Sequence, residues 1–297
     1  MEAALVGAIE AGGTKFVCAV GRSPEDFEEV RFPTLGPEET INNAINFFRA
    51  KETDMGKIQA IGIGSFGPAD VNPSSKKYGW ITNTPKKNWA QTDLGNPIRE
   101  ALAGIPMAFD TDVNAAAWGE GKWGAAQGLN NFVYITVGTG IGGGALVNGK
   151  ILHGNGHPEM GHLRIPKDSI KDPFPGSCPF HKDCLEGLAS GTAMKNRWKT
   201  DPATLPLEHK AWKLESGYLA DAIYNLTLSL APERFILGGG VMEQKQLFPM
   251  IRNDFNERLA DYMEIDNLDN YIVPPGLSSK SGVLGALSLA QELIKKP

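Results

Sequence analysis

One local pattern occurs twice in the chain: an apolar strand, a glycine turn that carries a threonine, and a returning apolar strand. The first copy is predicted over residues 4–20, around the turn Glu10-Ala-Gly-Gly-Thr-Lys15. The second is predicted over residues 132–147, around the turn Gly138-Thr-Gly-Ile-Gly-Gly-Gly144. Two such hairpins in one chain predict a duplicated unit, and this constrains the fold more than any other feature of the sequence.

Both turns are candidates for phosphate binding. Glycines without a side chain let backbone N–H groups approach an anion closely, and Thr14 and Lys15 add two donors to the first turn. The first turn is not a Walker loop, because the Gly-x4-Gly-Lys-Ser/Thr spacing is missing. A Gly-Gly pair between two strands is also what an ordinary hairpin contains, so this alternative stays open.

The remaining pattern alternates helices with strands. An amphipathic helix is predicted over 37–51. Further strands are predicted at 58–63, 105–109, 233–237 and 271–273, and further helices at 187–198, 218–230, 244–262 and 281–295. The polar stretch 70–96 is long for an inert connection, which favours a functional loop.

A carboxylate lies where one predicted strand gives way to a helix. Asp112 belongs to the run Asp110-Thr-Asp-Val-Asn114, which follows strand 105–109 and opens an alanine-rich helix. A carboxylate at the end of a strand is typical of active sites in α/β folds. The alternative interpretation is that Asp112 only caps the helix.

The stretch from Glu159 to Glu186 carries a candidate metal site. Its ligands are His162, Cys178, His181 and Cys184. Two thiolates and two imidazoles are the ligand set of a closed, structural Zn²⁺ site, and they favour zinc over Mg²⁺ or Ca²⁺.

The intervening segment Ile165–Ser177 is rich in proline and has no helix or strand period, so we expect a metal to hold it in place. The alternatives are chance thiols, a disulfide, or a redox site. The Cys178–Cys184 spacing is not Cys-x-x-Cys, and the interleaved histidines fit a metal better.

Composition excludes several classes of protein. The chain has 297 residues, 41% hydrophobic and 21% charged, with a net charge of −5, which gives no basis for binding nucleic acid. No apolar run approaches the ~20 residues of a membrane-spanning helix, and the first residues lack the basic start of a signal peptide. Reduced thiols on a metal fit a cytoplasmic protein.

Taken together, the two turns, the Asp112 site, Glu159-Met-Gly-His162, the Cys/His cluster and Leu237-Gly-Gly-Gly240 resemble the ROK family of sugar kinases. The resemblance implies an α/β, actin-like (hexokinase-like, ribonuclease H-like) fold with two lobes, a mixed sheet in each and the active site in the cleft between them. The first lobe is expected at 1–112 with the C-terminal helix 282–297, and the second at 113–281 with the zinc-binding segment 159–186.

The Cys-Pro-Phe-His-Lys-Asp-Cys form of the metal motif, and Glu10 at the first turn, look like the family's bacterial fructokinases. The resemblance therefore implies ATP-dependent phosphorylation of the 6-hydroxyl of D-fructose, with Asp112 as general base and ATP, Mg²⁺ and structural Zn²⁺ as cofactors. Many family members have Asp where this chain has Glu10. Whether Glu10 helps to hold the water shell of the Mg²⁺ ion is therefore an open question. The implied partners are the sugar, ATP and a second copy of the chain in a homodimer, without nucleic acid or membrane.

The same resemblance places the other site residues. Sugar contacts are expected from Asn83 (with Asn88 as a rival), Asn114, Glu159, His162 and Glu186. Nucleotide contacts are expected from Gly12, Gly13, Thr14, Lys15, Gly138, Thr139, Gly140, Gly238, Gly239 and Gly240. His162 is assigned first to the metal, and its second ring nitrogen could still serve the sugar or Glu159. The alternatives are a kinase for glucose, mannose or an N-acetylhexosamine, and a sugar sensor without turnover.

Overall fold

The computed structural model describes residues 4–295, with the side chain of residue 295 left out, and these divide into two compact units. The first unit runs to Gln127 and also includes His153–His157 and the chain from Lys280 onward. The second consists of Gly128–Leu152 and Pro158–Ser279. The helix that begins at Asp112 belongs to the first unit, beyond the sequence-based boundary at 112, because it packs along the C-terminal helix.

The first unit is built on a mixed sheet whose strand order, within the described residues, is β3-β2-β1-β4-β7. The bounds are β1 Val6–Ala11, β2 Lys15–Gly21, β3 Phe27–Pro33, β4 Ile61–Ser65 and β7 Met107–Thr111. Strands β1, β2 and β3 pair antiparallel, whereas β1, β4 and β7 run parallel. The predicted first hairpin is therefore β1–β2.

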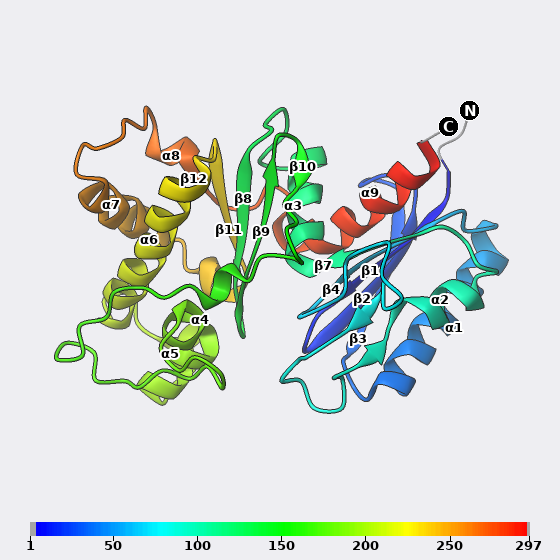
Figure 1. Ribbon diagram of the computed structural model, residues 1–297, viewed down its shortest axis with the longest axis horizontal. Helices are drawn as coiled ribbons and strands as arrows, with labels where there is room; N and C mark the ends of the chain where they lie inside the picture. Colours follow the sequence, from blue (N-terminus) through cyan, green and yellow to red (C-terminus); the bar gives the residue numbers. More distant parts are fainter. Residues whose placement is uncertain (1–3, 296–297) are drawn as a thin grey trace. The chain divides into compact units, whose positions relative to one another are not determined.

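Helices cover this sheet and supply much of its core. They are α1 Pro37–Met55, α2 Gly95–Ala101, α3 Asp112–Trp123 and α9 Ser281–Lys295. In Figure 1, α9 (red) returns to lie beside the blue strands β1 and β2 of the chain's beginning. The polar stretch 70–96 contains the short pair β5 Trp80–Ile81 and β6 Thr92–Asp93, and it buries Trp89 against Phe16 and Phe66.

The second unit repeats the topology of the first. Its strand order, counted over residues 4–295, is β10-β9-β8-β11-β12, with an antiparallel hairpin followed by parallel neighbours. The bounds are β8 Phe132–Val137, β9 Ile141–Val147, β10 Lys150–Ile151, β11 Arg234–Gly238 and β12 Ile272–Val273. The duplication predicted from the two hairpins thus extends to both complete sheets.

Helices α6 and α7 pack together on the core of the second unit. Its α-helices are α4 Leu185–Ala189, α5 Gly191–Trp198, α6 Ala211–Leu230, α7 Leu247–Leu259 and α8 Leu268–Tyr271. Short 3-10 turns are η1 Met160–His162, η2 Pro202–Thr204, η3 Gly240–Glu243 and, at the return to the first unit, η4 Ser278–Lys280. None of the described helices is long and apolar enough to cross a membrane.

The sequence-based prediction has no counterpart for strand β3 and helix α2, nor for the short elements β5, β6, β10 and α8. Strand β3 reads Phe-Glu-Glu-Val-Arg-Phe-Pro and mixes half-buried with exposed positions, as an edge strand does, so it lacks the apolar run that marks β1. Helix α2 lies at the end of the polar stretch, where Pro and Gly dominate, and only Gly95 and Ile98 are buried. Both are held mainly by their neighbours.

Candidate functional site

The carboxyl ends of the parallel strands β1, β4 and β7 meet at one edge of the first sheet. In the register, Glu10 of β1 lies beside Gly64 of β4, and Gly64 lies beside Asp110 of β7. Helix α3 begins directly over Gly64: a Cβ there would come within 2.6 Å of the Ala115 Cβ and 3.3 Å of the Asp112 Cα. The absence of a side chain at position 64 therefore seats Asp112 close to the sheet, near Glu10.

The cap of helix α3 is Thr111, not Asp112. The Thr111 hydroxyl accepts a hydrogen bond from the Asn114 backbone N–H at 3.2 Å, as an N-cap side chain does. Asp112 occupies the first helical position, is half-buried, and accepts from the Val113 backbone N–H at 2.9 Å. The helix thus has its cap without Asp112.

Glu10 is a second carboxylate close to Asp112. Its Oε2 atom is shielded from solvent and has no hydrogen-bond partner among the described residues. The Val283 backbone N–H at the start of α9 donates to this side chain, and a Cβ on Gly282 would lie 2.6 Å from its Cδ. Burial, helped by the charge of Asp112, raises the pKa of Glu10 to about 7, although Lys15 opposes the shift.

This pKa predicts a pH dependence of stability. Between pH 4.5 and pH 7 the folded state keeps a proton on Glu10 that the unfolded state releases, so stability falls as pH rises through this window. We expect Glu10→Gln to remove about 2–3 kcal/mol of that fall. Urea unfolding at pH 5, 6, 7 and 8 measures it.

Asp112→Asn is the matched variant for this prediction. It should move the pH window of Glu10 downward, because the repelling charge is gone while Glu10 remains. Parallel stability–pH curves for the wild type and Glu10→Gln would contradict the assignment.

Asp110 and His153 join the site, although the sequence alone did not single them out. Asp110 is buried and accepts from the Asn114 Nδ2 at 2.7 Å, the Thr111 N–H at 2.8 Å and the His153 Nε2 at 2.9 Å. The carboxylate raises the pKa of His153 above its ordinary value by accepting from its ring. The signal in the sequence was a second Asp two residues before Asp112 and a histidine in the glycine-rich run His153–His157.

Asp110 also determines how the Asn114 amide points. Asn114 is buried, and its Nδ2 must face the accepting Asp110 carboxylate, so its Oδ1 points away. That Oδ1 atom is shielded and has no hydrogen-bond partner within residues 4–295. An acceptor in this state is available for a donor such as a sugar hydroxyl.

The other predicted residues of the first unit lie at the surface or in the first turn. Gly12 donates its N–H to the Lys15 carbonyl at 2.9 Å, and residues 13–15 are exposed. Asn83 and Asn88 are both exposed, and Asn88 adopts the left-handed conformation with φ 68°. Nothing in their surroundings favours one over the other as a sugar contact.

In the second unit the four predicted metal ligands converge. One ligand atom from each of the residues His162, Cys178, His181 and Cys184 lies within 4.8 Å of the others. The Nδ1 of His162 is 3.4 Å from the Cys184 Sγ and 3.8 Å from the Cys178 Sγ. Bonds of about 2.0–2.3 Å in a tetrahedron give ligand separations of about 3.3–3.8 Å, so this spacing fits a zinc ion.

The chemistry of the donors fits as well. Both thiol residues are buried, and burial raises the pKa of Cys184 to about 11. Neither thiol is in a disulfide; Cys18 is likewise a free, buried core residue. A cation between the sulfurs would stabilise the thiolate form that burial disfavours.

The segment between the four predicted ligands is also anchored by contacts of its own. Asp172 is buried and is held by the Arg197 guanidinium through two contacts of 3.1 Å, and by the Tyr218 hydroxyl at 2.7 Å. Arg197 also lies over the Phe174 ring at 4.5 Å. A buried ion pair to α5 and a hydrogen bond to α6 therefore hold this segment in addition to any metal that the four predicted ligands bind.

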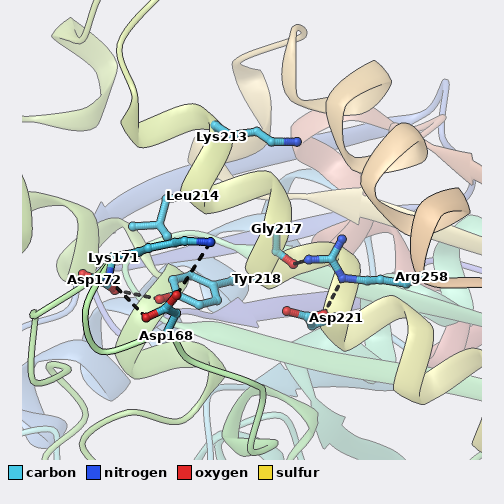
Figure 2. A pocket seen from close by; sticks show the side chains of 9 residues that line it. All are labelled: Asp168, Lys171, Asp172, Lys213, Leu214, Gly217, Tyr218, Asp221 and Arg258. Carbon is cyan, nitrogen blue, oxygen red and sulfur yellow. Dashed lines mark hydrogen bonds and ion pairs between the residues drawn. The ribbon is translucent and has the colours of Figure 1, made fainter.

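A small cavity of about 160 Å³ opens beside this anchor (Figure 2). Its charged lining residues are paired with one another or with neighbours: Lys171 with Asp168, Arg258 with Asp221, and Lys213 with Asp254. With its acids and bases matched, the cavity offers no excess charge for a phosphate, so we assign it to the structure and not to the chemistry.

The second unit has two glycine turns, Gly138–Gly140 and Gly238–Gly240, and they lie close to each other. Gly239, with φ 90°, packs so closely on β8 that a Cβ would lie 2.5 Å from the Val137 carbonyl oxygen. Val137 directly precedes the turn Gly138–Gly140, and Gly238 packs against the Tyr134 hydroxyl in the same way. Thr139 and Gly240 remain open toward solvent or unoccupied space.

Glu159 and Glu186 flank the metal cluster differently. Glu159 is exposed and begins the turn η1 that presents His162. Glu186 is half-buried on α4, and its Oε2 accepts from the Ile141 backbone N–H at 3.0 Å. The second unit therefore groups the metal ligands, both glutamates and the second turn.

Comparison with known proteins is consistent with this arrangement. The model of the ROK family matches residues 6–293. A fructokinase of Pediococcus pentosaceus is 44% identical over 292 residues, covering 98% of this chain and 99% of the relative.

Solved structures agree with the sequence comparison. The ROK hexokinase from Thermus thermophilus superposes with a TM-score of 0.77 at 27% identity, covering 99% of this chain and 100% of the other. A ROK family glucokinase from Streptomyces griseus, in complex with glucose and AMPPNP, gives a TM-score of 0.75 at 23% identity, over 97% and 99% of the two chains. These likenesses confirm the predicted actin-like, hexokinase-like fold.

Proposed function

The chain belongs to the ROK family, and from this premise we propose that it is a fructokinase that transfers the γ-phosphoryl group of ATP to the 6-hydroxyl of D-fructose. The observation that carries the proposal is the 44% identity with the Pediococcus fructokinase over nearly the whole of both chains. Use of ATP is supported by the glucokinase relative solved with AMPPNP.

Asp112 would act as the general base. Phosphoryl transfer needs mainly positioning and charge neutralisation, and a carboxylate beside the attacking hydroxyl accepts its proton as the bond to phosphorus forms. The half-buried position of Asp112, with the helix cap supplied by Thr111, supports this role. Asn114 would accept a hydrogen bond from the sugar through its unpartnered Oδ1.

The two glycine turns would hold the nucleotide phosphates through backbone N–H groups, together with Thr14, Lys15 and Thr139. The glycines Gly238–Gly240 would lie against the adenosine, because only residues without a Cβ permit close approach. A Mg²⁺ ion bound with ATP supplies charge neutralisation. Glu10, with an oxygen that has no hydrogen-bond partner in the described chain, fits a role in orienting the water shell of this ion.

The sugar-binding assignments of Asn83, Glu159, His162 and Glu186 are part of the same proposal, as are the zinc ion and the homodimer. Ionised glutamates and amide groups suit hydroxyls that both donate and accept. The zinc assignment is supported by the spacing of the four ligand atoms. Light scattering coupled to gel filtration tests the dimer.

A substrate panel tests the function. Purified enzyme is given ATP, Mg²⁺ and either fructose, glucose, mannose or N-acetylmannosamine, and release of ADP is followed by a coupled assay. We expect the largest kcat/KM with fructose. Faster turnover of another hexose would reassign the substrate, and sugar binding without turnover of any hexose would indicate a sensor.

The metal assignment has its own prediction. Replacing Cys178 by serine should reduce bound zinc, from about one ion per chain, because a closed site has lost one of its four ligands. The KM for fructose should rise, since the segment carrying Glu159 and Glu186 loses one anchor. Metal content is read by mass spectrometry.

Cys18→Ala is the matched control, because Cys18 is an equally buried thiol outside the cluster. It should leave the zinc content unchanged. Full zinc content and an unaltered KM in Cys178→Ser would refute the scaffold role.

A further inference from the structure

Glu186 is bonded to the second glycine turn. Its Oε2 accepts from the backbone N–H of Ile141, the residue that follows Gly140, at 3.0 Å. A Cβ on Gly140 would lie only 2.5 Å from the same oxygen. Only a glycine at position 140 therefore lets the Glu186 carboxylate come this close to the backbone of the turn.

The same turn is held on its other sides by η1, which carries the predicted ligand His162, and by α5. The carbonyl of Ile141 faces Gly161, where a Cβ would lie 1.8 Å away, and Gly161 directly precedes the metal ligand His162. On α5, the Gly191 N–H donates to the Gly138 carbonyl at 2.7 Å, and the Thr192 hydroxyl donates to the Thr139 carbonyl, also at 2.7 Å.

The position of Glu186 depends in turn on the cluster. Cys184, a predicted ligand, is the N-cap residue of α4, and its carbonyl accepts from the Leu188 N–H at 3.0 Å. Glu186 lies in the first turn of that helix. On the following residue, Gly187, a Cβ would be 3.1 Å from the Cβ of Cys178, the second sulfur ligand. Contacts therefore link Cys178 and Cys184, through α4, to the turn Gly138–Ile141.

We propose that Glu186 is a positioning residue that couples the four-ligand cluster to the turn Gly138–Ile141, so that the metal supports nucleotide binding as well as the sugar side of the site. This inference rests on the proposed function, which gives that turn its role with phosphates. The hydrogen bond between the Ile141 N–H and the Glu186 carboxylate keeps the turn in one conformation. A turn that is already ordered loses less conformational entropy when the nucleotide binds.

The coupling role and the sugar-contact role of Glu186 predict different results. Gln keeps an acceptor oxygen for the Ile141 N–H but loses the charge, whereas Ala loses both. If Glu186 positions the turn, Glu186→Ala should weaken ADP binding by about tenfold and Glu186→Gln should restore most of it. If Glu186 only contacts sugar, both variants should raise the KM for fructose and leave ADP binding unchanged.

Calorimetric titration with ADP and Mg²⁺, without sugar, measures this on the full-length protein, and steady-state KM values for ATP and fructose accompany it. Asp183→Asn is the matched control: it removes the charge of a partly exposed acidic group next to Cys184 that pairs with Arg164 at 3.3 Å. It should bind ADP within twofold of wild type.

Gly140→Ala tests the contact from the other side. The Cβ of the new alanine would contact the Glu186 carboxylate, so the substitution should weaken ADP binding in the wild-type background. In the Glu186→Ala background, where this carboxylate is gone, the same substitution should have little further effect. Removing zinc with a chelator should likewise weaken ADP binding in wild type but add little in Glu186→Ala, because both act through one linkage.

Three outcomes would overturn the coupling: Glu186→Ala binding ADP like the wild type, equal losses for Gln and Ala, or a chelator effect that adds fully to that of Glu186→Ala. Failure of the proposed function is seen separately. A wild type that binds ADP but phosphorylates no hexose would refute the kinase while leaving the coupling measurable, and a wild type that binds no ADP would refute both.

Discussion

Replacing Asp112 by asparagine is expected to lower kcat for fructose phosphorylation by about 10²- to 10⁴-fold, the range that general-base catalysis contributes. The amide cannot accept the proton of the sugar hydroxyl, although its oxygen can still accept from the Val113 N–H as the carboxylate does. The fold should survive, because Thr111 supplies the cap of α3. Asp112→Ala should have an equal or larger effect, with zinc content unchanged.

Steady-state kinetics with fructose and ATP, alongside circular dichroism and metal analysis, check this result. Asp93→Asn is the matched control: Asp93 is a half-buried aspartate of the same unit that accepts from the Asn96 N–H near the start of α2. It should leave kcat near the wild-type value. Sugar kinase activity within tenfold of wild type in Asp112→Ala would reject Asp112 as the base.

The largest expected loss of stability comes from Asp172→Ala. This change leaves the Arg197 guanidinium, whose side chain is only 6% exposed, without its two hydrogen bonds to a carboxylate. Removing one partner of a buried ion pair costs about 3–5 kcal/mol. The nearby Glu215 offers no ready substitute, because burial raises its pKa well above the ordinary value despite the opposing charge of Arg197.

In calorimetry, the unfolding transition of the second unit should shift downward by about 6–15 °C. Asp168→Ala is the control on the same segment: its pair with Lys171 spans 3.7 Å between exposed side chains, and its carboxylate accepts only from the exposed Ile170 and Lys171 N–H groups, so the melting temperature should fall by clearly less than in Asp172→Ala. A comparable shift for both variants would show that the segment is sensitive to any substitution, and would remove the buried pair as the cause.

The same comparison bears on the metal. Because Asp172 anchors the segment independently of the four ligands, a zinc-free protein should keep much of the fold of the second unit. Chelation should therefore lower its melting temperature without unfolding it at room temperature, unlike a small zinc finger that has no other core. The sequence analysis missed this second anchor because Asp172, Arg197 and Tyr218 are far apart along the chain.

The sequence by itself determined the repeated hairpins, most of the longer helices and the composition of the metal cluster. These depend on local rules: apolar runs predict buried strands, glycine pairs predict tight turns, and four Cys and His residues in a short stretch predict zinc ligands. The edge strand β3 escaped prediction because its residues are held by cross-strand pairing with β2 and not by an apolar run.

Tertiary structure alone decided which groups act together. The register across Glu10, Gly64 and Asp110 buries Glu10 near Asp112, and both effects raise the pKa of Glu10, while the return of the chain at His153 gives Asp110 its histidine partner. The contact of Glu186 with the second turn likewise joins residues 45 positions apart. Such pairings depend on packing between distant segments, where burial and low dielectric set the strength of each interaction, and no local pattern encodes them.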